Sequence, residues 1–325
     1  MKKALILGVT GQDGSYLAEI LLEHGYQVHG MYRKSATGNT KNIEHIISND
    51  KIYNNNFFLH RGDLADPTSI YRIINLIEPD EIYNEADQDH VSWSYDMVGY
   101  SSDITASAVG RLLEIIRQIN PKIKFFQPCT SNMFGKTDVH LLNENSKFNP
   151  QSPYAIAKTF AYYMSNYYRD SYGMHVSTAI LFNHESPRRP IDYLSRKVTK
   201  AVSRIYLGKQ SELILGDTGA SIDWGYAKEY MYAVHQILQL DKPDDYIIAT
   251  GVSHTVKQFV EKSFNYLGLD SNKYVFSSPD FVRPTKTSTL IGDISKAKKD
   301  FNFDPKVDLD KLIKIMIDSD LKSES

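Results

Sequence analysis

The stretch that decides the fold is Ala4-Leu-Ile-Leu7 followed by Gly8-Val-Thr-Gly11-Gln-Asp-Gly14. The first part is a short apolar run typical of a buried strand, and an amphipathic helix is predicted at Ser15–His24. Glycines at three-residue steps let the backbone turn tightly and approach a pyrophosphate at the helix N-terminus. The stretch therefore predicts the start of a dinucleotide-binding fold, against the alternative of a glycine-rich turn without a ligand. The residues predicted to contact the cofactor here are Gly8, Thr10, Gly11, Gln12, Asp13 and Gly14.

Short apolar runs and helical patterns alternate as far as residue 181. This alternation is typical of a parallel sheet with helices on both faces, so the predicted fold class is α/β, a Rossmann-type doubly wound parallel sheet. After residue 182 the segments become longer and more polar, which indicates a smaller C-terminal, substrate-binding α/β domain. We place the cofactor domain at 1–181, with a later contribution around 220–252, and the second domain mostly at 182–325. Strands are predicted at Ala4–Leu7, Val28–Tyr32, Phe57–His60, Glu81–Asn84, Lys124–Cys129 and His175–Leu181, and helices at Ser15–His24, Pro67–Ile77, Val98–Ile119 and Pro153–Tyr172.

The composition excludes several classes of protein. The 325 residues carry 37 Lys and Arg against 39 Asp and Glu, and this balance gives no reason to expect a nucleic-acid or anionic-membrane partner. Cys129 is the single cysteine, which rules out an intrachain disulfide framework and a cysteine-rich metal site, and no metal is expected. No apolar stretch approaches the roughly 20 residues of a membrane span, and the apolar run after Lys3 is too short for a secretory signal. We therefore expect a soluble, cytoplasmic protein.

Two further positions bear on the cofactor. The second predicted strand ends in Tyr32-Arg33-Lys34, where an acidic residue would bind the ribose 2′-hydroxyl of NAD and an arginine would suit the 2′-phosphate of NADP. Because no acid is present, the local chemistry leans towards NADP, although a basic pair on a loop is commonly only solvated. Asp63-Leu64, after the third predicted strand, is where an adenine ring would be held.

A candidate catalytic pair lies in the helix predicted at Pro153–Tyr172. Tyr154 and Lys158 are four residues apart and share one helix face. A phenol with a pKa of about 10 is a poor base near neutrality, but an adjacent ammonium favours the phenolate. Tyr154 would then take a proton from a substrate hydroxyl while hydride leaves the same carbon for nicotinamide, and Lys158 would also reach the nicotinamide ribose. Thr130, just past the strand Lys124–Cys129, would donate a hydrogen bond to the reacting oxygen.

Together, the glycine loop, Thr130, Tyr154 and Lys158 resemble the extended short-chain dehydrogenases/reductases. The sequence is most similar to the GDP-mannose 4,6-dehydratase family, and the similarity covers nearly the whole chain. The run Asn183-His-Glu-Ser-Pro-Arg-Arg189 is highly specific to that family. The other segments that carry the resemblance are Gly8-Val-Thr-Gly-Gln-Asp-Gly-Ser-Tyr-Leu17, Arg61-Gly-Asp-Leu64, Asp223-Trp-Gly225, Ile248-Ala-Thr-Gly-Val252 and Arg283-Pro284.

The resemblance implies roles for residues that composition and spacing leave open. His184 and Arg189 would approach the cofactor, and Asn183 would contact the nucleotide sugar. Lys197 and Arg283 match positions that bind the GDP portion, where cations meet the diphosphate. The remaining cofactor-binding residues that the resemblance implies are Ala86, Gln88 and Tyr100.

Several residues depart from the family pattern. In the dehydratases a glutamate removes the C5 proton so that water is eliminated across C5–C6, but this sequence has Asn132 there, and an amide has no useful basic site. Glu85, Asp87 and Asp89 lie in a stretch that the family keeps nearly uncharged close to nicotinamide and sugar, and one of them could replace the missing base. Ile222 stands where the family has arginine, so one phosphate contact is lost or supplied elsewhere.

Oxidation at C4 needs only the threonine, the tyrosine, the lysine and the cofactor, whereas elimination has lost its base at Asn132. The sequence therefore resembles the C4-oxidising variant of the family, the GDP-D-glycero-D-manno-heptose 4-dehydrogenases of capsule heptose synthesis. This resemblance implies tightly bound NAD, with NADP open, and a second oxidant such as a 2-oxo acid to recycle NADH. The alternatives are a GDP-sugar 4,6-dehydratase with Asp87 or Asp89 as the base, a C4 epimerase, and a non-catalytic cofactor-binding module.

The resemblance also implies partners. Short-chain dehydrogenases pair through the helices that correspond to Val98–Ile119 and Pro153–Tyr172. The related dehydratases form dimers of dimers through the loop that corresponds to Ser35–Asn42. We therefore expect a homodimer or homotetramer that binds a GDP-sugar.

Overall fold

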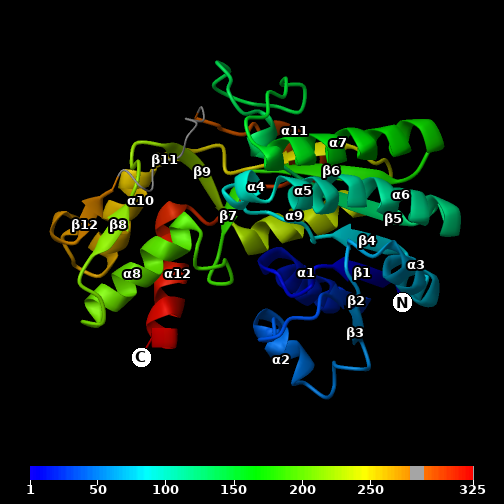
Figure 1. Ribbon diagram of the computed structural model, residues 1–325, viewed down its shortest axis with the longest axis horizontal. Helices are drawn as coiled ribbons and strands as arrows, with labels where there is room; N and C mark the ends of the chain where they lie inside the picture. Colours follow the sequence, from blue (N-terminus) through cyan, green and yellow to red (C-terminus); the bar gives the residue numbers. More distant parts are fainter. Residues whose placement is uncertain (279–288, 325) are drawn as a thin grey trace. The chain divides into compact units, whose positions relative to one another are not determined.

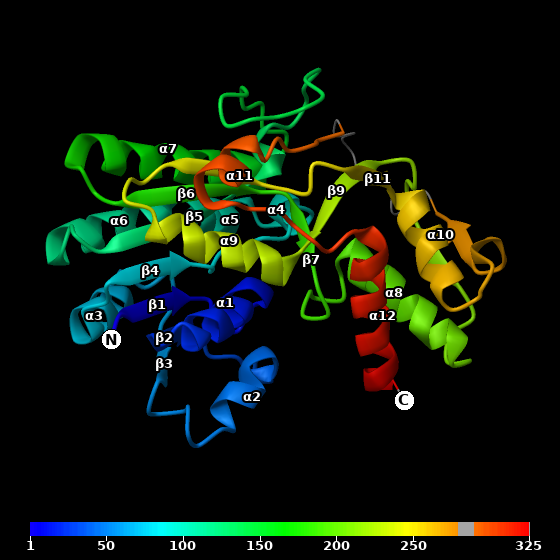
Figure 2. The same ribbon diagram turned by 180° about the vertical axis from the view of Figure 1, so that it is seen from behind.

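The computed structural model, shown from opposite sides in Figures 1 and 2, describes residues 1–278 and 289–324. The chain divides into two compact units. The first unit consists of Met1–Gly135, Lys147–Leu181 and Tyr230–Tyr246, and the second of Lys136–Ser146, Phe182–Glu229 and Ile247–Ser325.

The first unit is built on a seven-stranded sheet in the order β10-β6-β5-β4-β1-β2-β3. The pairs from β6 to β3 are parallel, and the strand order is that of a doubly wound dinucleotide-binding sheet, which confirms the predicted fold class. Leu7 is level with both Met31 and Asn84, so the carboxyl ends of β1, β2 and β4 meet along the edge where ligands bind in such folds. The strands are β1 (Lys3–Leu7), β2 (Gln27–Tyr32), β3 (Phe57–Arg61), β4 (Glu81–Asn84), β5 (Lys124–Thr130), β6 (Val176–Leu181) and β10 (Asp245–Ile248).

Helices cover both faces of this sheet. On one face, α3 (Pro67–Ile77), α6 (Ala108–Ile119) and α7 (Pro153–Tyr172) share a buried apolar cluster with β1, β4, β5 and β6. Figure 1 shows α6 and α7 lying across this face. The other face carries α9 (Ala227–Gln239), which is in front in Figure 2, and α1 (Gln12–Glu23), whose last residue accepts a hydrogen bond from Tyr232 of α9 at 3.1 Å.

The bounds of α7 follow from its local sequence. The Ser152 hydroxyl accepts a hydrogen bond from the Ala155 N–H at 3.1 Å, and Pro153 occupies the first turn, where its missing N–H costs nothing. Gly173 ends the helix with a φ of 63°, a conformation that favours glycine. The observed bounds, Pro153–Tyr172, equal the predicted ones. The tyrosine–lysine pair is therefore held in the first two turns of a long, well-capped helix.

One predicted helix is interrupted. The single helix expected at Val98–Ile119 is α5 (Val98–Ser102), a π-helical turn at Asp103–Ser107 and then α6. Within this turn the Thr105 hydroxyl accepts a hydrogen bond from the Gln88 N–H at 3.2 Å and donates to the Gln88 carbonyl at 3.3 Å. The wide turn is explained by this contact, because π-turns form where a helix must accommodate a neighbouring segment, commonly at functional sites.

The second unit combines two small sheets with packed helices. One sheet has the order β11-β9-β7, and the other pairs β8 with β12 in parallel. Its apolar core lies among α8, α10 and α12 and includes Trp224, Phe259 and Met316. The elements are β7 (Asn183–Glu185), α8 (Leu194–Tyr206), β8 (Leu213–Leu215), β9 (Ser221–Tyr226), β11 (Ser253–Thr255), α10 (Val256–Tyr266), β12 (Val275–Ser277), α11 (Ser295–Phe301) and α12 (Leu309–Glu324).

Short helical segments complete the chain. They are α2 (Glu44–Ile47), α4 (Trp93–Asp96) and the 3-10 turns Lys41–Ile43, Ser131–Met133 and Ser271–Lys273. Across residues 1–278 and 289–324, no helix has both the length and the apolar character needed to span a membrane.

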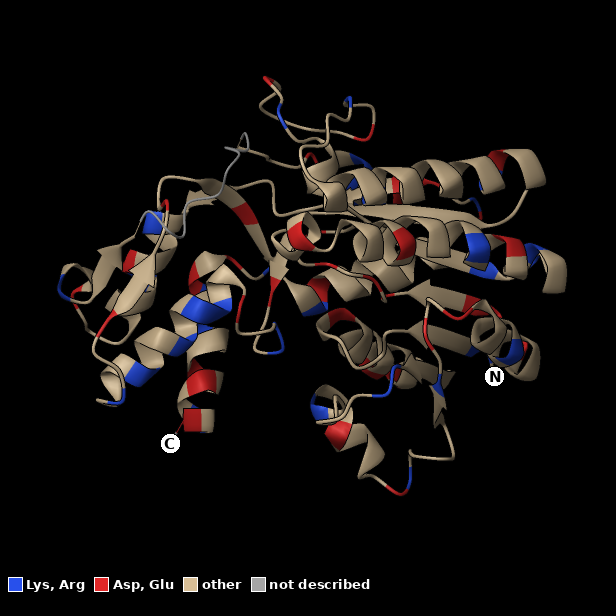
Figure 3. Cartoon of the chain, in the orientation of Figure 1, with Lys and Arg blue, Asp and Glu red and all other residues tan. Residues whose placement is uncertain are grey.

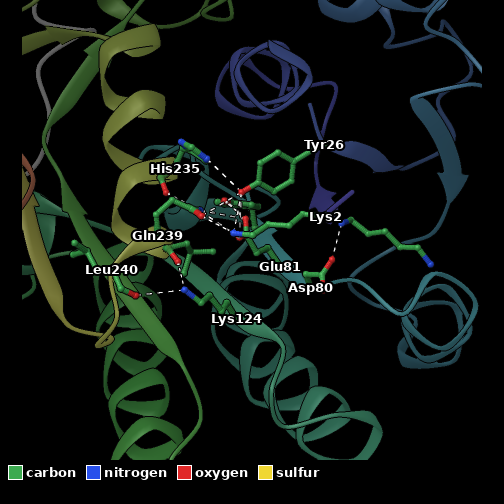
Figure 4. Close-up of polar contacts among 11 residues, drawn as sticks. Lys2, Tyr26, Asp80, Glu81, Lys124, His235, Gln239 and Leu240 are labelled. Carbon is green, nitrogen blue, oxygen red and sulfur yellow. Dashed lines mark hydrogen bonds and ion pairs between the residues drawn. The ribbon is translucent and has the colours of Figure 1, made fainter. Parts of the chain in front are cut away.

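The amino end of β4 carries a buried carboxylate, and Figure 4 shows the polar contacts around it. Glu81 accepts hydrogen bonds from the Lys2 ammonium at 2.9 Å, the Tyr83 hydroxyl at 2.8 Å and the Tyr26 hydroxyl at 3.2 Å. The side-chain amide of Gln239 in α9 donates to it at 3.3 Å. A charged group that is 1% exposed is therefore surrounded by donors, as burial of a carboxylate requires.

Candidate active site

The glycine loop after β1 requires glycine at two of its three positions. Gly8 has a φ of 79°, and its N–H donates to the Met31 carbonyl at 3.0 Å. A Cβ at Gly8 would lie 2.4 Å from the Glu85 carbonyl oxygen, and one at Gly14 would lie 2.4 Å from the Gly8 carbonyl oxygen. The strand-to-helix turn therefore packs backbone against backbone, and it leaves the N-terminus of α1 open towards the ligand edge of the sheet.

The loop after β2 is tied to the glycine loop through Thr10. The Asn39 side-chain amide donates to the Thr10 hydroxyl at 3.4 Å, and that of Asn42 donates to the Thr10 carbonyl at 3.1 Å. Gln12 is buried at the start of α1, and its amide donates to the Asp13 carboxylate at 3.1 Å. The predicted cofactor residue Thr10 is therefore held by the loop after β2, and Gln12 and Asp13 are held by each other.

Four cations line a pocket of about 660 Å³ beyond the carboxyl ends of β2 and β3. Arg33 donates to the Tyr100 hydroxyl at 2.9 Å, and Arg72 of α3 donates to the Arg61 carbonyl at 3.2 Å. Asp63 also lines this pocket, so three predicted cofactor residues, Arg33, Asp63 and Tyr100, lie close together in the first unit. The cations are Arg33, Lys34, Arg61 and Arg72, and the acids beside them are Asp63 and Asp66.

The predicted catalytic residues Thr130, Asn132 and Tyr154 lie together. The Thr130 hydroxyl oxygen accepts hydrogen bonds from the Asn132 N–H at 3.3 Å and from the Asn132 side-chain amide at 3.1 Å. The Thr130 side chain also acts on Tyr154, where a hydroxyl donor lowers the pKa of the phenol and so favours the phenolate. Tyr154 is 7% exposed, and its burial raises the pKa of the phenol in spite of that donor.

Lys158 completes this group and has an unexpected partner. Its ammonium donates to the Pro128 carbonyl at 2.9 Å and lies 5.9 Å from the centre of the Tyr154 ring. It also forms an ion pair with Asp87, in which the two side chains are only 4% and 16% exposed. Burial acts to lower the pKa of Lys158, but the Asp87 carboxylate outweighs it and raises that pKa, so the ammonium stays charged.

Glu85 lies between the glycine loop and this ion pair. Its carbonyl oxygen faces Gly8, and its side-chain Oε1 atom is buried without a hydrogen-bond partner among the residues described. Burial, followed by the charge of Asp13, raises the pKa of the Glu85 carboxyl well above its usual range. Burial also raises the pKa of Asp87, although Lys158 opposes this. At the carboxyl end of β4, burial of the acids therefore disfavours their charged forms, whereas the buried acid at the amino end is surrounded by donors.

Several other predicted residues serve the structure around the site. Ala86 lies against Gly8, because a Cβ there would be 2.9 Å from the Ala86 Cα atom. Gln88 is buried, and its side chain donates to the His90 carbonyl at 2.9 Å and accepts from Ser101 at 3.1 Å. Leu64 belongs to the apolar core of the sheet. The positions are thus close to the site, but the polar atoms of Gln88 have partners within the protein.

The single cysteine lies at the end of β5 beside Thr130. Cys129 is buried, and burial raises the pKa of its thiol to about 12. A thiol in this state is not a nucleophile near neutral pH, so its role is packing. In the described residues, no three His, Cys, Asp or Glu side chains gather in a way that could hold a metal ion.

In the second unit, the run after β6 forms a connected group. His184 in β7 is buried, and its Nδ1 atom lies 2.7 Å from the Phe182 carbonyl, so Nδ1 carries the proton. Arg189 lies 3.8 Å above the Tyr193 ring, and its Nε atom is 3.5 Å from the buried Glu185 carboxylate. Asn183 is the first residue of β7 and is exposed. The run Asn183–Arg189 therefore includes a buried acid, Glu185, that holds Arg189 in place.

The helix α8 carries several basic residues, which are blue in Figure 3. Arg196 pairs with Asp320 of α12, and Arg204 donates to Glu324 at 2.9 Å. Lys197, which the resemblance assigns to the nucleotide, donates instead to the Ile214 carbonyl at 2.8 Å, and burial lowers its pKa. The other nucleotide-binding candidate, Arg283, lies outside the described residues.

The motif Asp223-Trp-Gly225 has a structural role in the second unit. The Asp223 carboxylate accepts hydrogen bonds from the Thr250 N–H at 2.9 Å, the Thr250 hydroxyl at 2.5 Å and the Gly251 N–H at 2.9 Å. It thereby fixes the turn that contains the second motif, Ile248-Ala-Thr-Gly-Val252. Ile222, where the resemblance leads one to expect arginine, packs against the apolar core.

Comparison with known sequences agrees with this geometry. A profile of the family described as GDP-mannose 4,6 dehydratase matches residues 5–316. The chain belongs to the GDP-mannose 4,6-dehydratase family. GDP-mannose 4,6 dehydratase 1 of Arabidopsis thaliana is 45% identical over 326 residues, which cover 99% of this chain and 90% of that protein. The Homo sapiens GDP-mannose 4,6 dehydratase is 41% identical over 340 residues, which cover 98% and 91% of the two chains.

Solved structures share the fold at lower identity. A dTDP-glucose 4,6-dehydratase from Bacillus anthracis, in complex with NAD, is 20% identical with a TM-score of 0.86 and covers 100% and 98% of the two chains. A UDP-glucose 4-epimerase from Thermotoga maritima is 22% identical with a TM-score of 0.86 and covers 99% and 100%. The expected GDP-mannose 4,6-dehydratase family is thus confirmed. The narrower expectation of a heptose 4-dehydrogenase is not supported, because these sequence relatives are named GDP-mannose 4,6 dehydratases.

Two parts of the site were missed at the level of sequence. The sequence indicates Asp87 only as a substitute base, because its partner Lys158 is 71 positions away in the chain. Arg61 and Arg72 were not assigned to the pocket that contains Arg33. A signal was present for Arg61, which directly follows the strand predicted at Phe57–His60 and lies two positions before Asp63, but nothing local to α3 indicates that Arg72 lines the same pocket.

Proposed function

We propose that this protein is a GDP-sugar 4,6-dehydratase-type oxidoreductase that begins by oxidising C4 of its sugar. The observation that carries the proposal is the assembly of Thr130, Tyr154 and Lys158 at the carboxyl edge of the sheet, in a chain of this family. Tyr154 accepts the proton of the C4 hydroxyl, Thr130 hydrogen bonds to the phenolate, and Lys158 supplies positive charge next to both. A bound dinucleotide supplies the hydride acceptor.

The residues of the first unit fit an NAD(P) cofactor. At Gly8 and Gly14 a Cβ would collide with neighbouring backbone, so only glycine allows the tight turn that brings the loop backbone close to a pyrophosphate. Four cations in the pocket beyond β2 and β3 supply the charge that a 2′-phosphate needs, which favours NADP. The family resemblance implies NAD, so both dinucleotides are supplied when the reaction is tested.

A second candidate reaction stops at the 4-keto sugar, as in the GDP-manno-heptose 4-dehydrogenases. It is favoured by one observation, that Asn132 occupies the position of the elimination base and uses its amide as a donor to Thr130. If dehydration does occur, another group removes the C5 proton. Glu85 and Asp87 are the acids nearest the catalytic lysine, and Asp87 is already engaged by Lys158. An oxidase would also need a second oxidant such as a 2-oxo acid.

The test is the mass of the product formed from GDP-mannose and from a GDP-manno-heptose, each with NAD or NADP. Loss of water supports the complete dehydratase, and loss of two hydrogens supports the oxidase. Asn132→Glu is expected to raise dehydration at least tenfold if only the base is missing, whereas the control Asn132→Gln, of equal length but without a carboxylate, is not. No conversion of either substrate with either cofactor would refute the proposed function.

We also propose that the chain forms homodimers through α5 and α7. The exposed apolar residues of α7 recur at helical spacing, so that Ile156, Phe160, Tyr163 and Tyr167 form one stripe. Val98 of α5 adds a further exposed apolar side chain. The family resemblance assigns Asn183 to the nucleotide sugar, and Lys197 and Arg283 to its GDP portion. Lys197 would have to release the Ile214 carbonyl to reach a diphosphate.

A further inference from the structure

The ammonium of Lys158 is held from two sides. The Pro128 carbonyl accepts one of its hydrogens at 2.9 Å, and the Asp87 carboxylate forms an ion pair with it. An ammonium has three N–H donors, so one donor remains for a third group after these two contacts. Lys158 can therefore keep its proposed contact with a cofactor ribose while Asp87 is bound.

Asp87 also changes the electric field at Tyr154. A lone ammonium would favour the phenolate, but a carboxylate bound to the same ammonium disfavours it and cancels part of the effect. Burial raises the pKa of Tyr154, Lys158 lowers it, and Asp87 and then Asp89 raise it again. Lys158 and Asp87 thus act on the phenol in opposite directions from almost the same place.

Other titratable groups face this pair from several elements. Asp13 of α1 and Asp89 of the loop after β4 raise the pKa of Asp87, and Asp13 also raises that of Glu85. Cys129 of β5 acts on Lys158, but burial keeps it a thiol. None of these groups is an ion-pair partner of Lys158 in the described residues, whereas Asp87 is. Asp87 is therefore the acid with the strongest hold on the lysine.

We infer that Asp87 is a positioning residue for Lys158, which fixes the ammonium beside Tyr154 and offsets its charge, so that Asp87 sets the pH range in which Tyr154 exchanges its proton. The inference rests on the proposed function of Tyr154 as the group that exchanges a proton with the C4 oxygen. It concerns regulation of that step by an acid that departs from the family pattern.

The first experiment measures the pH dependence of single-turnover cofactor reduction by the GDP-sugar, in the wild type and in Asp87→Asn. Removing one carboxylate charge is expected to move the rising limb of the profile to lower pH by about one unit, which is about a tenfold gain in rate on that limb. Asp87→Glu restores the charge and is expected to restore the wild-type profile. The control Asp170→Asn removes an exposed carboxylate from the same helix, α7, and is expected to leave the profile unchanged.

The second experiment needs no turnover. The Lys158 side chain is titrated by NMR in protein labelled with 13C at the lysine ε-carbon, and Lys158→Arg assigns the signal. The midpoint for Lys158 is expected to fall by at least about one unit in Asp87→Asn, because the buried ammonium loses its counter-ion. If Asp87→Asn does not fold, Asp87→Ser takes its place in both experiments.

The two arms separate this inference from the proposed function. Absence of turnover in the wild type refutes the function, and the lysine titration then decides the inference alone. Identical lysine titrations in the wild type and Asp87→Asn would overturn the inference whatever the activity. A changed titration with an unchanged pH–rate profile would overturn it as well, since Asp87 would then hold the lysine without influencing Tyr154.

Discussion

The two ends of β4 place acids in opposite circumstances. At the amino end, Glu81 is 1% exposed and receives hydrogen bonds on both oxygens from four side chains. At the carboxyl end, a buried oxygen of Glu85 has no hydrogen-bond partner among the described residues, and Asp87 depends on Lys158. The difference shows that burial of an acid does not reveal its role, whereas the supply of donors does.

The donors at the amino end come from three directions and stabilise the fold. Lys2 precedes β1, Tyr26 precedes β2, and Gln239 ends α9, so Glu81 joins the sheet to a helix on its face (Figure 4). The carboxyl end cannot be closed in the same way, because in this fold that edge is kept free for ligands. Glu85 and Asp87 therefore have raised pKa values, and carboxyl groups of this kind can exchange protons closer to neutral pH.

The largest expected effect tests whether the reaction takes place at the carboxyl end of β4 and its neighbouring strands. Tyr154→Phe removes the phenol oxygen and keeps the ring, and we expect C4 oxidation to fall by about 10²- to 10⁴-fold while cofactor affinity is retained. Tyr163→Phe, on the exposed side of the same helix, is the matched control. The rate is measured by absorbance of the reduced cofactor, and a Tyr154→Phe enzyme with the wild-type rate would contradict the assignment.

The structural role of the amino end is tested by Glu81→Ala. The change removes a buried acceptor that four side chains share, and it leaves the buried Tyr83 hydroxyl without its acceptor, so we expect the free energy of unfolding to fall by about 2–4 kcal/mol. Urea denaturation followed by circular dichroism measures this loss. Glu44→Ala, at an exposed position of α2, should cost much less. A Glu81→Ala protein as stable as the wild type would show that the network does not stabilise the fold.

Glu85→Gln is expected to change stability in the opposite direction to Glu81→Ala, and by the smallest amount. Since the folded state raises the pKa of Glu85, the wild type loses stability as pH rises from the unfolded pKa, near 4.5, towards the folded one. The amide removes this loss, so we expect Glu85→Gln to be more stable than the wild type by about 1 kcal/mol at pH 8 and indistinguishable from it at pH 4. Thermal unfolding at both pH values measures the difference. If Glu85→Gln were less stable than the wild type at pH 8, Glu85 would stabilise the fold as Glu81 does.

Much of the first unit was predictable because its signals are local. The glycine loop, the bounds of α3, α7 and β4, and the spacing of Tyr154 and Lys158 depend on residues a few positions apart. The interrupted helix at 98–119 was not predictable in this way, because its π-turn accompanies a hydrogen bond between Thr105 and Gln88, which are distant in the sequence. Its sequence pattern is that of an ordinary amphipathic helix.

The sequence by itself determined the strand–helix rhythm, the glycine loop, the spacing of the candidate catalytic residues Tyr154 and Lys158, and the amide at Asn132. Only the tertiary structure decided that Asp87 binds Lys158, that Arg72 joins Arg33 in one pocket, and that Glu81 is satisfied while Glu85 is not. The physical reason is range. Periodicity, capping and turn chemistry act within a few residues, whereas a buried charge is stabilised or left unpaired by donors that only the folded chain brings to it.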